Sequence, residues 1–307
     1  MPMPKTAIVT GADEKYFWLL GGLIQSLTQV NAQAQCDIVV LDFGLTSEQV
    51  RRLKDEWRVS VVTPECAVDV PPKFAHARYF AFSLRCALPR VVPGYDIYLW
   101  MDSDTWVQDD SFIQAFVEVA QKGKLAIVAE TEPAYSTSLE LIGWNLKNQV
   151  CGFGIRDGLR VYFAPAINNG VFATRGDHPV WNAWEARYLA SVRRADKVVM
   201  DQHSLKAALR LDRIGVEYMD TRFNWLCSRA APMFDPDNQH FCVPRSPFQR
   251  ISVLHLAGNS KNPEIVVPLL GGGSTTKSVL FEADEPAENC RRNEIVRVER
   301  EDLHQVG

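Results

Sequence analysis

The sequence lacks any long apolar run. No stretch of its 307 residues approaches the length needed to cross a bilayer, and its first residues lack the charged and apolar regions of a signal peptide. We therefore expect a cytoplasmic protein whose association with membranes is at most peripheral.

Paired cysteines are missing as well. The seven cysteines are scattered along the chain, and no two of them form a Cys-x-x-Cys motif. Disulfide frameworks and zinc sites depend on such pairing, so we expect buried free thiols in a reducing compartment.

An excess of positive charge is also absent. The 33 Lys and Arg residues against 37 Asp and Glu residues give a net charge of -4. A general nucleic-acid binder needs a basic face, so we expect no nucleic-acid partner.

The hydrophobic content of 47% and the charged content of 23% are ordinary for a globular protein. The length suits one large α/β domain.

In the first half of the chain, short apolar runs alternate with segments of helical periodicity. This alternation is typical of βαβ units, which build a mostly parallel sheet flanked by helices. Thr46 or Ser47 is expected to cap one of the helices. Strands are expected over residues 7–9, 38–41, 59–62, 97–101 and 125–128, and helices over residues 18–30, from residue 46, and over residues 75–88.

The character of the chain changes after residue 263. Three glycines at 271–273 precede Ser and Thr, and residues 284–293 are polar and mostly charged. We expect a domain over 1–263, with a nucleotide-binding half at about 1–110 and an acceptor-side half at about 111–263. Residues 264–307 are expected to form an appendage or a partly mobile tail.

The motif Asp102-Ser103-Asp104 directly follows the strand expected over residues 97–101. Ligands bind at the carboxyl ends of parallel strands. Mg²⁺ and Mn²⁺ prefer oxygen ligands and leave positions open for substrate phosphates. The motif therefore predicts a divalent-cation site for a diphosphate, although the same residues also form caps and turns.

A second apolar run leads to His255, which is followed by Gly258 and Lys261. A lone histidine is often structural, but imidazole also suits Mn²⁺ as a third ligand. A glycine allows close approach of the backbone, and a lysine beyond it can hold a phosphate as a point charge.

Several separated motifs together resemble glycosyltransferase family 8, which includes bacterial lipooligosaccharide galactosyltransferases and glycogenins. The resemblance runs in order from about residue 5 to residue 263. It implies an α/β, GT-A (Rossmann-like) single domain with a mostly parallel central sheet. The motifs contain Asp13 and Tyr16, Asp42 with residues 45–49, Arg85, Asp102 and Asp104, Asn168-Asn169-Gly170, Asp201-Gln202, residues 221–224, and His255 to Lys261.

The resemblance also implies roles for these residues. The donor is expected to be a UDP-sugar, with UDP-glucose or UDP-galactose favoured, and the acceptor a glycan or another hydroxyl compound. Asp13 would hydrogen-bond the uracil and Tyr16 would stack on it, while Asp102, Asp104 and His255 would hold Mn²⁺ or Mg²⁺. The other donor contacts would come from Arg85, Ser103, Asn168, Asn169, Gly170, Gly258 and Lys261. Glu130, which follows the strand expected over residues 125–128, is a separate candidate for contact with a hydroxyl of the donor sugar.

Transfer with retention of configuration is a further implication of the resemblance. Double displacement needs a carboxylate beneath the anomeric carbon, but Gln202 occupies the matching position beside Asp201. We therefore expect same-face substitution, with Gln202 stabilising developing positive charge. Acceptor stacking platforms are sought among Trp144, Trp181, Trp184 and Trp225.

Three alternatives stay open at the level of sequence. A phosphatase of the Asp-x-Asp type would use Asp102 as nucleophile, but Trp106 replaces the Thr or Val expected there. A catalytically silent protein could bind nucleotide sugars or glycans without turnover. A self-glycosylating primer could use Tyr162 or Tyr218.

Overall fold

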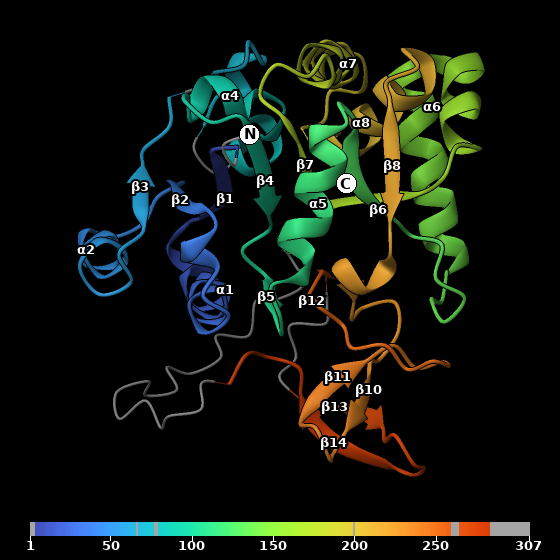
Figure 1. Ribbon diagram of the computed structural model, residues 1–307. Helices are drawn as coiled ribbons and strands as arrows, with labels where there is room; N and C mark the ends of the chain where they lie inside the picture. Colours follow the sequence, from blue (N-terminus) through green and yellow to red (C-terminus); the bar gives the residue numbers. More distant parts are fainter. Residues whose placement is uncertain (1–3, 66, 77–78, 199, 259–263, 283–307) are drawn as a thin grey trace.

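The computed structural model describes residues 4–65, 67–76, 79–198, 200–258 and 264–282. A seven-stranded sheet forms its centre (Figure 1). β7 runs antiparallel to both of its neighbours, and the other neighbouring pairs are parallel, as the sequence predicts. The strand order is β3 (Ser60–Val62), β2 (Asp37–Asp42), β1 (Thr6–Ala12), β4 (Ile97–Met101), β7 (Ile167–Arg175), β6 (Leu125–Ala129) and β8 (Val216–Met219).

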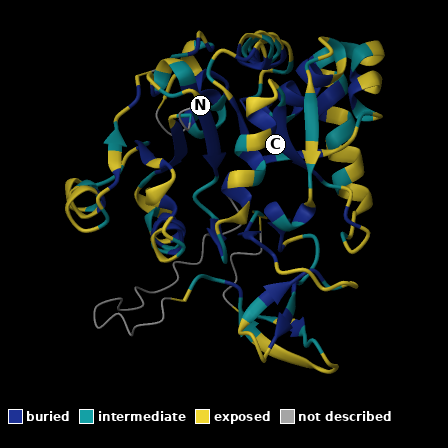
Figure 2. Ribbon diagram, in the orientation of Figure 1, coloured by how far each residue is buried: buried dark blue, intermediate teal, exposed yellow. Residues whose placement is uncertain are grey.

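Helices cover both faces of the sheet, because successive strand residues point to opposite sides. In β1, Ile8 packs into one hydrophobic cluster and Val9 into the other. The cluster of Ile8 includes residues of α1 (Phe17–Gln29) and α5 (Ser111–Gln121). The cluster of Val9 includes residues of α7 (Val180–Ala195) and α8 (Asp201–Leu211). The middle strands are therefore buried on both faces, as Figure 2 shows.

Helix α2 (Ser47–Asp55) begins as the sequence predicts. The Thr46 hydroxyl accepts a hydrogen bond from the Gln49 backbone N–H at 3.2 Å, and the Gln49 side chain accepts one from the Thr46 N–H at 2.9 Å. This capping box satisfies two N–H groups that the helix itself leaves without partners.

The continuous helix predicted over residues 75–88 is wrong. The chain forms η3 (Pro72–Phe74), α3 (Phe80–Ser83), η5 (Arg85–Ala87) and α4 (Leu88–Val91) instead. Pro89 has no N–H to donate to the carbonyl of Arg85, so helical hydrogen bonding does not run from η5 into α4 through this residue. A proline is tolerated in the first turn of a helix, where Pro89 lies.

Helix α6 (Leu139–Tyr162) lies beside α7 and α8 and is kinked at Gly154, whose backbone has φ 80° and ψ 169°. The described residues also form the short helices η1 (Glu14–Tyr16), η2 (Ala32–Ala34) and η6 (Thr221–Phe223).

A second sheet lies below the carboxyl edge of the central sheet (Figure 1). Its strands are ordered β5 (Thr105–Val107), β12 (Val253–His255) and β9 (Trp225–Leu226). Two hairpins extend the chain beyond it: β10 (Met233–Asp235) with β11 (His240–Cys242), and β13 (Glu264–Pro268) with β14 (Ser274–Ser278).

The hairpin β13–β14 packs on the rest of the protein. Val267 is fully buried, and the indole N–H of Trp106 donates to the Val279 carbonyl at 2.8 Å. Residues 264–282 therefore share a hydrophobic cluster with residues of β5, β9, β10, β11 and β12. The domain boundary at residue 263 stays a prediction, and residues 283–307 lie outside the described residues.

The described cysteines are all free thiols, and four of the five are buried, as predicted; Cys151 is exposed. Cys66 and Cys290 lie outside the described residues. In the described part of the chain, no helix is both long enough and apolar enough to cross a bilayer.

Candidate active site

Polar residues meet at one edge of the central sheet because of its strand directions. β1, β4 and β6 run the same way, so Asp13, Asp102 and Glu130 follow their carboxyl ends at the same edge. β7 runs in the opposite direction, and its first residues, including Asn168, lie at this edge too. The predicted site residues from distant parts of the chain are thus brought together.

Asp102, Asp104 and His255 form a cluster. Three of their potential ligand atoms lie within 4.8 Å of one another. Nε2 of His255 is 3.2 Å from Oδ1 of Asp104 and 3.8 Å from Oδ2 of Asp102. Two carboxylate oxygens and one imidazole nitrogen suit Mn²⁺ or Mg²⁺, so these side chains fit the cation that the sequence predicts.

Burial and charge oppose each other in this cluster. Burial lowers the pKa of His255, but the carboxylates of Asp104 and Asp102 outweigh burial, and the net shift of the pKa is upward. Burial raises the pKa of Asp102, and the negative charge of Asp104 raises it further, while Arg85 opposes both. A bound cation would relieve this crowding of negative charge.

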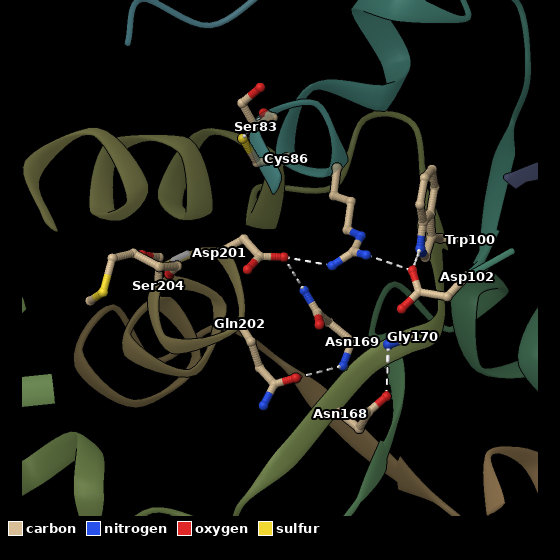
Figure 3. A network of polar contacts seen from close by, with 12 residues as sticks. Ser83, Cys86, Trp100, Asp102, Asn168, Asn169, Gly170, Asp201, Gln202 and Ser204 are labelled. Carbon is tan, nitrogen blue, oxygen red and sulfur yellow. Dashed lines mark hydrogen bonds and ion pairs between the residues drawn. The ribbon is translucent and has the colours of Figure 1, made fainter. Parts of the chain in front are cut away.

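Arg85 joins the cation cluster to α8. Its guanidinium donates to Oδ1 of Asp102 and to Oδ2 of Asp201, both at 2.6 Å. Asp102 and Asp201 lie on opposite sides of this contact network (Figure 3). The indole N–H of Trp100 also donates to Asp102, at 2.7 Å, and the guanidinium lies 5.2 Å from the Trp100 ring. Arg85 therefore positions two carboxylates, while its predicted donor contact stays a prediction.

Amides connect α8 with the start of β7. The side chain of Asn169 donates to Asp201 at 2.9 Å, and the backbone N–H of Asn169 donates to the side-chain amide oxygen (Oε1) of Gln202 at 3.4 Å (Figure 3). The backbone N–H of Gly170 donates to Oδ1 of Asn168 at 2.9 Å. Asp201 and Gln202, the first residues of α8, are thus fixed against the strand that carries the asparagines.

Glu130 lies at the end of β6 and is paired with Arg229 at 3.2 Å. Burial raises the pKa of Glu130, and Arg229 is the strongest of the groups that oppose this. The sequence offered no signal for Arg229, because it lies in the turn after β9, outside the motif at residues 221–224. Trp100 was also missed, since it is part of a continuously buried strand.

Asp13 and Tyr16, which the sequence predicts to bind the nucleotide, lie beyond the end of β1. The carboxylate of Asp13 accepts from the Tyr16 backbone N–H at 3.1 Å and caps η1. The Tyr16 side chain is exposed. Ser103 is partly exposed in the turn between β4 and β5, and Gly258 has φ 63°. Lys261 lies outside the described residues.

The four tryptophans that the sequence offers as acceptor stacking platforms differ in how far they are buried. Trp181, Trp184 and Trp225 are buried and pack in the core, whereas Trp144 is 46% exposed. The Trp144 ring lies 5.1 Å from the ring of His203, the residue after Gln202. Burial lowers the pKa of His203 to about 4, so its imidazole is neutral at neutral pH. Trp144 therefore offers an aromatic surface next to the start of α8.

Comparisons with known proteins agree with this arrangement. Residues 7–155 match the family model described as glycosyl transferase family 8. None of the curated proteins matches the sequence.

Solved structures share the fold. A galactosyltransferase LgtC, crystallised with donor and acceptor sugar analogs, is similar with a TM-score of 0.51 and 18% identity, over 82% of this chain and 87% of that one. The bifunctional glycosyltransferase WbbM has a TM-score of 0.52 and 16% identity, over 83% of this chain and 46% of that one. Mouse xyloside xylosyltransferase 1 has a TM-score of 0.53 and 11% identity, over 85% of this chain and 99% of that one.

The absence of a side chain at Gly170 is needed for the packing of His255. A Cβ at this position would lie 2.3 Å from Cε1 of His255 and 2.8 Å from Oδ1 of Asn168. We expect Gly170→Ala to lower the free energy of unfolding by about 1–3 kcal/mol, the usual range for overpacking. Urea unfolding measures the change.

Gly143→Ala is the matched control, because nothing lies within 4 Å of a Cβ at that helical position. It should leave stability unchanged or raise it by up to about 1 kcal/mol. Equal stabilities of the two variants would contradict the packing argument.

Proposed function

We propose that the chain is a metal-dependent, retaining hexosyltransferase of glycosyl transferase family 8, since residues 7–155 match the model of that family. The proposed donor is a UDP-sugar, with UDP-glucose or UDP-galactose favoured. The proposed acceptor is a glycan or another hydroxyl compound. A cytoplasmic location stays a prediction.

The observation that supports this proposal best is the cluster of Asp102, Asp104 and His255 at the carboxyl edge of the sheet. These three side chains would hold Mn²⁺ or Mg²⁺. A divalent cation there would neutralise the donor diphosphate as the bond to the sugar breaks.

The donor would lie along the edge that starts at β1. Asp13 and Tyr16 follow β1 and are proposed to bind the uracil, in keeping with the exposure of the Tyr16 ring. On the sugar side, the proposed contacts are Asn168, Asn169, Gly170 and Glu130, which share the start of β7 and the end of β6. Arg85, Ser103, Gly258 and Lys261 are proposed to complete the donor site.

The surroundings of Asp201 favour same-face transfer over double displacement. Oδ2 of Asp201 already accepts hydrogen bonds from Arg85 and Asn169, and the positive charge of Arg85 weakens it as a nucleophile. Gln202 carries no charge. We propose that the acceptor hydroxyl attacks on the face from which the diphosphate departs, and that a diphosphate oxygen takes its proton. The Gln202 amide oxygen would stabilise positive charge on the sugar.

The two enzymatic alternatives have less support. A phosphatase would need Asp102 as a free nucleophile, but its Oδ1 accepts from both Arg85 and Trp100. Among the described residues, no contact of Tyr162 or Tyr218 favours a self-glycosylating primer. The rival that needs a direct test is therefore a silent binding protein.

We predict that UDP binds in the presence of Mn²⁺ and that this binding is lost in Asp102→Ala/Asp104→Ala, because the variant removes two of the three cation ligands. Calorimetric titration with and without Mn²⁺ measures both effects. Glu48→Ala/Asp55→Ala is the control, since it removes two exposed carboxylates from α2. Absence of UDP binding by the wild type with either cation would overturn the donor assignment.

We predict that Gln202→Ala lowers turnover by about 10²-fold while UDP binding stays within a few-fold of wild type. The reason is that the amide would act on charge that develops only in the transition state. Initial rates with UDP-glucose and UDP-galactose, in transfer and in hydrolysis, measure this. Gln114→Ala, on α5, is the control. Turnover at the wild-type rate in Gln202→Ala, or equal losses of turnover and UDP binding, would refute the proposed role of Gln202. Absence of turnover in the wild type itself would favour a catalytically silent binding protein.

We predict that Trp144→Ala raises the acceptor KM about 5- to 10-fold, because one stacking contact contributes on the order of 1 kcal/mol. Trp144→Phe should recover part of the loss, and UDP binding should not change. Trp18→Ala, on α1, is the control because Trp18 is 53% exposed. An unchanged acceptor KM in Trp144→Ala would exclude Trp144 as the platform.

A further inference from the structure

The imidazole of His255 has a different partner at each nitrogen. Nδ1 lies 2.9 Å from Oδ1 of Asn224, and Nε2 faces Asp104 at 3.2 Å. A neutral imidazole carries one proton, so it can donate through one nitrogen and offer a lone pair through the other. Only the tautomer with its proton on Nδ1 offers the Nε2 lone pair to a cation.

A chain of hydrogen bonds determines which atom of Asn224 faces the ring. The backbone N–H of Gly170 can only donate, and it contacts Asn168 at 2.9 Å, so the contacted atom of Asn168 is its oxygen (Figure 3). That oxygen also lies 2.9 Å from Asn224, and it can only accept from the NH₂ group there. The remaining atom of the Asn224 amide is the oxygen, which is turned toward His255.

The contact of the Asn168 side-chain NH₂ group supports the same orientation of the Asn168 amide. Its amide also hydrogen-bonds the Glu130 carboxylate, which accepts, so the NH₂ group of Asn168 points to Glu130. Glu130 in turn is held by Arg229. The direction of donation is therefore fixed at both ends of Asn168 by groups that have only one possible role.

Burial excludes water, which would otherwise compete for these hydrogen bonds. Asn224 is fully buried, and His255 is 3% exposed. The backbone of His255 is held between β5 and β9, and the space beside its ring is closed by the Gly170 backbone. The ring therefore has little freedom to turn and exchange its two nitrogens.

We propose that Asn224 is a positioning residue that keeps the proton of His255 on Nδ1 and thereby presents the Nε2 lone pair to the cation held with Asp102 and Asp104. The tautomer is set by the Gly170 N–H, through Asn168 and Asn224. This inference rests on the proposed function only in its last step, the binding of the cation.

The first test reads the tautomer directly in the full-length protein saturated with diamagnetic Mg²⁺, because a bound cation prevents the carboxylates of Asp104 and Asp102 from competing with Asn224 for the imidazole proton. Long-range ¹H–¹⁵N spectra of ¹⁵N-histidine-labelled protein are recorded at neutral pH with and without Mg²⁺. His255→Gln identifies the signal. We expect a protonated Nδ1 and an unprotonated Nε2. A proton on Nε2 in the Mg²⁺-loaded protein would overturn the proposal, whatever the behaviour of any variant.

The second test measures Mn²⁺ affinity by calorimetry. Asn224→Leu cannot accept the Nδ1 proton, so we expect loss of the tautomer preference and a Kd for Mn²⁺ that rises about 10- to 100-fold. Asn224→Asp still accepts this proton, and it should keep the tautomer and bind Mn²⁺ more tightly than the Leu variant. Asn148→Leu is the matched control, because it makes the same substitution at an asparagine that is 1% exposed on α6.

The outcomes separate the two proposals. Wild-type tautomer and Mn²⁺ affinity in a folded Asn224→Leu variant would overturn the role of Asn224. A wild type that binds neither Mn²⁺ nor Mg²⁺ would overturn the proposed cation site, whereas a wild type that binds them with a proton on Nε2 would overturn only the role of Asn224. Loss of Mn²⁺ binding in Asn148→Leu to the same extent as in Asn224→Leu would count against a specific role.

Discussion

The contact of one guanidinium with two carboxylates is the interaction on which the site depends. Arg85 lies between Asp102, at the end of β4, and Asp201, at the start of α8. Each charge is costly to bury alone, and the effective penalty in a protein is several kcal/mol for an unpaired ion. The pairing compensates for this and also fixes the distance between the cation cluster and the start of α8.

The local structure around Arg85 follows from the same requirement. In a continuous helix over residues 75–88, successive side chains would point in different directions around the helix axis, and the direction of the Arg85 side chain would be set by the orientation of the whole helix. The break before Pro89 instead lets a short turn, η5, carry Arg85. On the opposite side of the site, the reversed direction of β7 brings the asparagines and Gly170 to the ends of the parallel strands.

The sequence predicted the parts of this arrangement that depend on local patterns. Buried runs of apolar residues marked β1, β2 and β4, and the spacing of Thr46 and Gln49 marked the start of α2. The meeting of Asp102, Asp104 and His255 was also predicted, because each follows or ends an apolar strand and the resemblance named them together.

What the sequence could not predict depends on contacts between distant segments. The pairing of Arg85 with Asp201 joins residues 116 positions apart, and that of Arg229 with Glu130 joins residues 99 apart. No local pattern distinguishes a charged residue with such a partner from one on the surface. Likewise, only packing distinguishes the exposed Trp144 from the buried Trp181, Trp184 and Trp225.

The hydrogen-bonded amides of Asn168 and Asn224 connect the proposed donor-sugar site with the cation cluster. Asn168 is proposed to contact the donor sugar, and its oxygen also directs Asn224 toward His255. Because the Gly170 backbone N–H fixes the direction of donation at Asn168, the orientation of the Asn224 amide does not require a titrating group. The electrostatics of the cluster can then change when a cation or a diphosphate enters, while the lone pair at Nε2 stays directed at the same point. Such preorganisation is what a site needs if its charges are to act on a departing group without first rearranging.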